Sequence, residues 1–89
     1  MSHYKYKTKG TCSKMIDFDL EDGKLSDVKF VGGCNGNLKA IGKLVEGADA
    51  ETIANILKGN TCGERPTSCA DQLSKAIHGA LTGELKPIE

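Results

Sequence analysis

The sequence predicts an α+β domain in which a three-stranded antiparallel sheet, built from the N-terminal half, is covered on one face by three helices. Apolar and polar residues alternate with the period of a strand in residues 4–8, 16–20 and 28–30. From Leu38 onward the apolar spacing lengthens to the period of a helix. Strands that all precede the helices are typical of this class. With 89 residues, the chain should form a single domain, residues 1–89.

The first strand should lie at an edge of the sheet. Its apolar positions alternate with lysines, and a row of lysines on an edge strand blocks further strand pairing. In the second strand one face carries apolar residues at every other position. The alternating residues of the two strands are Tyr4, Tyr6 and Thr8, and then Ile16, Phe18 and Leu20.

A tight turn should join the second and third strands. Asp22-Gly23 is typical of a two-residue hairpin turn, because both residues accept positive φ. Val28 and Phe30 then share one face, but Leu25 is out of phase with them. We therefore expect a bulge or an early strand end near Ser26.

Three helices are expected after the strands. The first helix should end at Gly47, and its apolar face comprises Leu38, Ile41, Leu44 and Val45. The second helix should begin at the capping residue Asp49 and end at Gly59. Its apolar face comprises Ile53, Ile56 and Leu57. Residues 59–66 read as a loop. The third begins with a capping box formed by Ser68 and Asp71, buries Leu73, Ala76, Ile77, Ala80 and Leu81, and stops at Gly83. Residues 84–89 should form a loosely held tail.

Composition excludes several functional classes. Twelve basic and twelve acidic residues cancel, which argues against general nucleic-acid binding. No apolar run reaches the roughly 20 residues of a membrane span, and the N-terminus lacks a secretory signal, so we expect a cytoplasmic protein that does not enter a membrane. In that compartment thiols stay reduced, and four cysteines indicate metal ligands or redox groups before structural disulfides.

The four cysteines Cys12, Cys34, Cys62 and Cys69 are all expected at the ends of elements, where ligands gather. Cys69 should open the third helix, where the positive end of the helix dipole favours thiolate. Glycines around Cys34 allow backbone N–H groups to approach its sulfur. Four soft thiolates favour zinc or an iron–sulfur cluster, and we expect one site with zinc. No pair has the C-x2-C spacing of zinc ribbons, and Cys12 is the least supported ligand.

Other chemistry is less well supported. The glycine loop before Cys34 could instead cradle a phosphate, but it matches neither the P-loop nor the dinucleotide fingerprint. His78 should lie on the surface, opposite the apolar stripe of its helix, and His3 precedes the predicted core. Asp71 could orient a ligand in addition to capping its helix.

The stretches Gly32-Gly33-Cys34-x-Gly36-Asn37-Leu38 and Thr67-Ser68-Cys69-Ala70-Asp71, with the single Cys62 between them, resemble the TSCPD domain. Ala70 replaces the usual proline. The resemblance covers about residues 8–81. It implies a cysteine-based metal site and a link to adenosylcobalamin-dependent ribonucleotide reductases, in which the domain is C-terminal. Such an enzyme, or a nucleotide, would be the partner. The chain has no room for a reductase barrel, so we expect a metal-binding module and not a complete catalyst.

A more distant likeness is to iron–sulfur cluster scaffold proteins, which implies that Cys34, Cys62 and Cys69 are cluster ligands. The scaffold's histidine before its last cysteine is Ser68 here. Two alternatives to the zinc module therefore remain: a cluster scaffold or carrier, and a thiol redox partner in which a pair such as Cys62 and Cys69 cycles to a disulfide.

Overall fold

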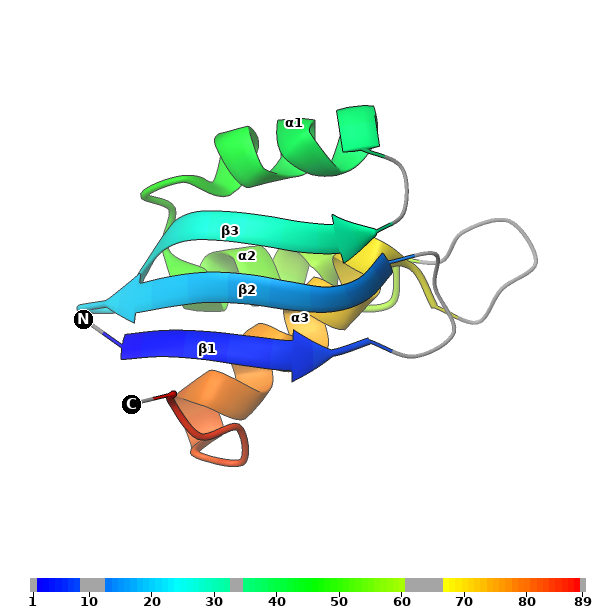
Figure 1. The fold of residues 1–89 in the computed structure, drawn as a ribbon. Helices are drawn as coiled ribbons and strands as arrows, with labels where there is room; N and C mark the ends of the chain where they lie inside the picture. The colour runs from blue at the N-terminus through cyan, green and yellow to red at the C-terminus, as the bar shows by residue number, and fades with distance from the viewer. Residues whose placement is uncertain (1, 9–12, 33–34, 61–66, 89) are drawn as a thin grey trace.

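The computed structural model describes residues 2–8, 13–32, 35–60 and 67–88, and it has the predicted order of three strands followed by three helices (Figure 1). The strands are β1 (Ser2–Lys7), β2 (Ser13–Glu21) and β3 (Lys24–Gly32). The helices are α1 (Asn35–Val45), α2 (Ala50–Leu57) and α3 (Cys69–Thr82). The α+β prediction is confirmed. No helix among the described residues is both long and apolar enough to cross a bilayer.

The sheet is antiparallel in the order β1-β2-β3, so β1 is an edge strand as its lysines predict. Tyr4 pairs with Phe18, and their rings stack with centroids 5.3 Å apart. The hairpin between β2 and β3 turns at Asp22 and Gly23, whose φ angles of 50° and 77° are those of the predicted turn.

The predicted irregularity in β3 is a bulge. Asp17 pairs with Lys29 and Asp19 pairs with Ser26, which leaves one residue of β2 opposite two of β3. Asp27, in the bulge, has a φ of 52°. The bulge moves Leu25 into phase with the core, where it is fully buried.

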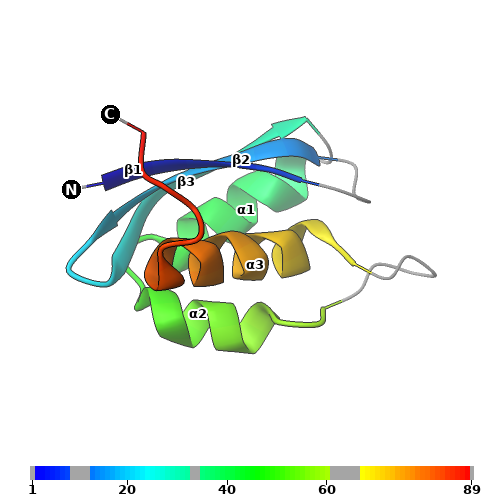
Figure 2. The ribbon, with the colours of Figure 1, turned by 90° about the horizontal axis from the view of Figure 1, so that it is seen from below.

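All three helices lie on one side of the sheet (Figures 1 and 2). Helix α1 packs on β3, and a Cβ added at Gly42 would lie only 2.7 Å from the Val28 carbonyl oxygen, so glycine permits this approach. Helix α2 packs on α3. The predicted cap of α2 is confirmed, because Asp49 accepts hydrogen bonds from the Thr52 backbone and hydroxyl.

The core contains most of the predicted apolar residues, but each helical stripe is narrower than predicted. Leu44 is 81% exposed, Ile56 is 68% exposed and Leu81 is 42% exposed. Leu44 lies about 100° around its helix from Val45, and Ile56 about 100° from Leu57, so each falls beyond the face that the neighbouring elements cover. The buried core comprises Tyr4, Ile16, Phe18, Leu25, Val28, Val45, Ala50, Ala54, Leu73, Ala76 and Ile77.

The expectation of a loosely held tail is wrong for the described residues 84–88. After Gly83 ends α3 with a φ of 85°, the Leu85 backbone N–H donates to Gly79 O at 2.9 Å. Ile88 N donates to His3 O at 2.7 Å and forms an isolated bridge with β1. These backbone contacts are not encoded in any apolar periodicity, which is why the sequence pattern missed them.

Candidate metal centre

Cys69 is the first residue of α3 and is buried. Ser68 caps the helix in an extended conformation, with its hydroxyl accepting from Asp71 N at 3.1 Å. This cap leaves Cys69 in the first turn, where unpaired backbone N–H groups and the helix dipole favour negative charge. The local setting is therefore suited to a thiolate ligand.

The Cys69 thiol reaches across the fold to the first residue of β2. Its Sγ donates to Ser13 Oγ at 3.1 Å. Ser13 is buried, and its carbonyl oxygen accepts from the Thr8 hydroxyl at 2.6 Å. Ser13 also pairs with Gly32 at the end of β3. The start of β2, the end of β3 and the start of α3 therefore meet at one end of the sheet (Figures 1 and 2).

The segment that follows α2 lies at the same end of the sheet. The Ser68 hydroxyl, adjacent to Cys69, donates to Asn60 O, and Asn60 Nδ2 lies 3.3 Å from the Ser68 oxygen. Asn60 is therefore fastened beside the start of α3. We call Ser13, Gly32, Asn60, Ser68 and Cys69 the cysteine end of the domain.

The Asp71 carboxylate connects the start of α3 to the segment that follows α2. Its carboxylate accepts from Gly59 N at 2.7 Å and from the Thr67 hydroxyl at 2.5 Å, and Lys75 Nζ lies 3.7 Å away. The hydrogen bond from Thr67 is the main reason that the pKa of Asp71 is lowered; burial opposes this effect, and Gly59 N–H and Lys75 add to it. The cap of α3 is therefore supplied by Ser68 as predicted, whereas the Asp71 carboxylate ties α3 to the segment that follows α2 and to Thr67.

The structure locates one of the four predicted ligands. Cys12, Cys34 and Cys62 lie outside the described residues. In the ranges that are described, there is no group of three or more His, Cys, Asp or Glu side chains that could hold a metal ion. The sequence neighbours of the three are described: Ser13 directly follows Cys12, Gly32 precedes Cys34 by two residues, and Asn60 precedes Cys62 by two. All three neighbours belong to the cysteine end.

Neither histidine lies at the cysteine end. His78 is nine residues beyond Cys69 along α3, or roughly 13 Å at 1.5 Å per residue. It is only partly exposed, and its Nε2 atom is buried without a hydrogen-bond partner in the described part of the chain. The expectation that His78 lies on the surface is therefore wrong for this ring nitrogen, which is buried.

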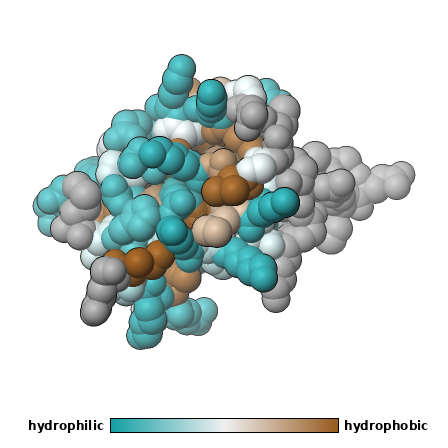
Figure 3. All heavy atoms as spheres, viewed as in Figure 1, coloured by the Kyte–Doolittle hydropathy of each residue, from teal (hydrophilic) through white to brown (hydrophobic). Residues whose placement is uncertain are grey.

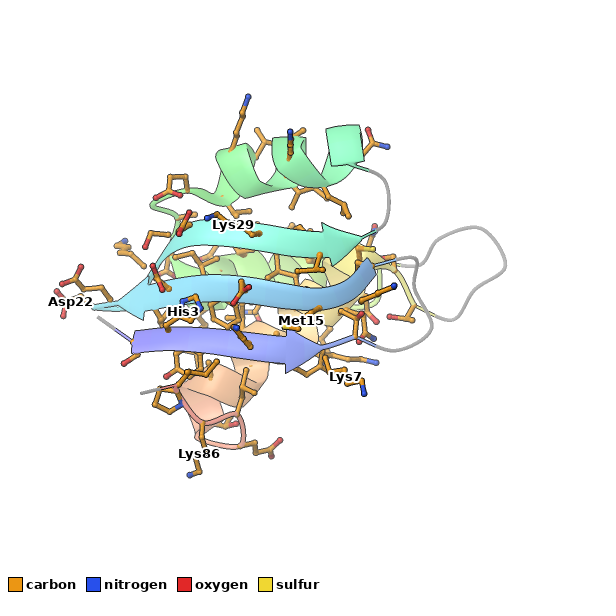
Figure 4. The ribbon with its side chains drawn as sticks, in the orientation of Figure 1. His3, Lys7, Met15, Asp22, Lys29 and Lys86 are labelled. Atoms are coloured by element: carbon orange, nitrogen blue, oxygen red, sulfur yellow. The ribbon has the colours of Figure 1, made fainter. Side chains whose placement is uncertain are left out.

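His3 instead forms a charged cluster on the outer face of the sheet (Figure 4). Its Nδ1 lies 2.5 Å from Asp19 Oδ1, and its Nε2 lies 2.9 Å from Asp17 Oδ1. The hydrogen bond to Asp19 is the main cause that raises the pKa of His3, opposed by desolvation and reinforced by Asp17. Both ring nitrogens are engaged by carboxylates, so the cluster stabilises an imidazolium.

The contacts of two groups of residues were not predicted from the sequence. Ser13 directly follows the predicted ligand Cys12, and Thr67 directly precedes the helix cap Ser68. These positions in the sequence are the signal that could have identified the two residues. His3, Asp17 and Asp19 all occupy the polar face of the predicted β1–β2 pair, so an antiparallel register would have placed them together.

A family model described as the TSCPD domain matches residues 2–81 of the chain. The chain matches no curated protein and no solved structure.

Proposed function

The chain belongs to the TSCPD domain family, and on this premise we propose that it is a small metal-binding module with zinc as the occupant. The ligands are Cys34, Cys62 and Cys69, with Cys12 as the fourth. In this role the thiolates would hold the zinc, and the bound metal would contribute to the stability of a domain with a small core.

The convergence at the cysteine end is the observation that carries this proposal. Ser13, Gly32, Asn60 and Cys69 come from four different parts of the chain and are joined by hydrogen bonds or strand pairing. Each is a cysteine or lies within two residues of one. Because each residue spans at most about 3.6 Å, this arrangement supports a single site, and it strengthens the case for Cys12 in particular.

The donor set also fits zinc. Cys69 lies at a helix N-terminus and beside the Ser13 hydroxyl, which can turn to donate to a thiolate. Hydrogen bonds of this kind orient metal ligands and adjust their basicity. When bound, zinc would act as a structural cross-link between β2, β3 and α3, while Ser68, Thr67 and Asp71 hold the start of α3 in place.

The partner in this proposal is a ribonucleotide-reductase-type enzyme, with a nucleotide as the alternative. This association comes from the family alone. The module acts with that enzyme and does not carry out the reduction itself.

Metal content tests the proposal. The full chain, purified under reducing conditions without added zinc, should contain one zinc per chain and no visible absorbance. Single substitutions of Cys34, Cys62 and Cys69 by Ser should each abolish stoichiometric zinc, and Cys12→Ser should do the same. Protein that is free of metal as purified and that does not bind added zinc would overturn the proposal.

The iron–sulfur scaffold is the second candidate, favoured by Cys69 at the start of the last helix, as in the scaffold likeness. Anaerobic reconstitution with iron and sulfide distinguishes it, because a cluster would give charge-transfer absorbance that Cys69→Ser removes. Tight zinc binding with no such absorbance would reject the scaffold. Rapid alkylation of the as-purified thiols would instead favour redox cycling.

A further inference from the structure

A groove runs between α1 and β3, and none of the residues that line it is a proposed metal ligand. Its volume is about 600 Å³. Over β3 and α1, Figure 3 shows hydrophobic side chains between hydrophilic ones. Residues of β3, from Asp27 to Phe30, and of α1, from Leu38 to Lys43, line the groove together with Glu46.

The floor of the groove is apolar, and α1 and β3 approach each other closely there. Val28 and Leu38 are each 7% exposed, and Phe30 is partly exposed beside them. Gly42 lets α1 approach the Val28 carbonyl so closely that no side chain fits between them. An apolar hollow lies beside this close approach of α1 to β3.

More basic than acidic side chains surround this floor. Asp27 lies 3.5 Å from Lys29, and its backbone N–H donates to Glu46 at 2.8 Å, so both acidic groups have partners. Lys39 and Lys43 have no ion pair within the part of the chain that the structure describes. They are four residues apart on α1 and therefore lie on the same side of the helix.

We propose that this groove binds a small organic anion with an apolar body. The apolar part would lie on Val28, Phe30 and Leu38, and the anionic group would lie between the ammonium groups of Lys39 and Lys43. Burial of the apolar part supplies most of the binding free energy, and the two lysines select the charge. This site is separate from the proposed metal site and does not depend on it.

Naphthalene-2-sulfonate is a suitable probe, with neutral 2-naphthol as its uncharged counterpart. In ¹H–¹⁵N spectra of the full chain, titration with the sulfonate should shift amides of residues 27–30 and 38–46. The double variant Lys39→Gln/Lys43→Gln should weaken binding by roughly fivefold, since exposed charge pairs are worth a fraction of a kcal/mol each. 2-Naphthol should bind more weakly than the sulfonate to the unaltered protein and equally to the double variant.

Lys5→Gln/Lys7→Gln removes the same charge from the exposed side of β1 and serves as the matched control, with less than a roughly twofold change expected. Circular dichroism checks that both variants fold. Three results would overturn the proposal: shifts centred outside the groove, equal weakening by the two double variants, or sulfonate affinity unchanged by loss of Lys39 and Lys43.

Discussion

Cys69 and Ser13 are 56 residues apart in the chain, and yet the Cys69 thiol donates a hydrogen bond to the Ser13 hydroxyl at 3.1 Å. This contact joins the start of α3 to the start of β2. Ser13 directly follows Cys12, and Cys69 is the only cysteine in the described part of the structure, so the contact brings these two cysteine segments together. The proposed metal site is organised around it.

Ser13→Ala should therefore lower zinc affinity. Metal binding converts Cys69 to a thiolate, which can then accept from the Ser13 hydroxyl, and loss of such an outer hydrogen bond typically costs about tenfold or more in metal affinity. Competition with a chromophoric chelator would measure this.

The control is Ser74→Ala. Ser74 lies in α3, and its buried hydroxyl donates to Ala54 O at 2.6 Å. It should cost about 1 kcal/mol of stability and leave zinc affinity unchanged. Equal zinc affinities for Ser13→Ala and the unaltered chain would contradict this role of Ser13.

Asp71→Asn should destabilise the domain substantially. The carboxylate accepts from both Gly59 N and the Thr67 hydroxyl, and an amide offers only one acceptor oxygen for these two donors. We expect a loss of about 2 kcal/mol, typical of charge-assisted hydrogen bonds, measured by urea unfolding.

Asp49→Asn is the matched control, because Asn caps a helix about as well as Asp and can still accept from Thr52 N. Its cost should stay below about 0.5 kcal/mol. Similar losses in the two variants would show that the contacts of Asp71 to Gly59 and Thr67 add no more than an exposed helix cap does.

Gly42→Ala should destabilise the packing of α1 on β3. The added methyl group would lie 2.7 Å from a backbone oxygen that cannot turn away, so the helix must move. The expected cost is about 1 to 3 kcal/mol, as for overpacking elsewhere.

Gly36→Ala lies in the same helix with nothing within 4 Å of the added Cβ. It should be neutral or stabilising by up to about 1 kcal/mol, because alanine is the better helix former. Thermal unfolding of both variants measures the difference, and equal midpoints would refute the close approach at Gly42.

The His3 cluster should make stability depend on pH. Hydrogen bonding to Asp19 raises the pKa of His3 above its ordinary value of 6.5, so the folded state binds this proton more tightly than the unfolded state. The stabilisation is complete below pH 6.5 and is lost as pH rises through the raised pKa of the folded state. His3→Gln should flatten this part of the stability curve.

Because the His3 side chain is 39% exposed, added salt should also reduce the effect. Urea unfolding between about pH 6 and 8, at low and high salt, provides the measurement. An unchanged slope in His3→Gln would assign the pH dependence to other groups.

Local patterns sufficed for the elements themselves. Asp22-Gly23 predicts its turn because few residues accept positive φ, Asp49 and Ser68 predict helix starts because their side chains satisfy free N–H groups, and Leu25 predicts the bulge by its phase. Leu44 and Ile56 were misplaced because periodicity gives the direction of an apolar face but not the width that neighbours cover.

The sequence by itself determined the order of strands and helices, their turns and caps, and the family likeness built on its cysteine segments. These features follow from backbone preferences and side-chain spacing within a few residues. Only the tertiary structure decided that Cys69 meets Ser13, that Asp71 holds Gly59, and that His3 lies between Asp17 and Asp19. Such contacts depend on strand register and on how closely helices approach the sheet, and no local pattern specifies those distances.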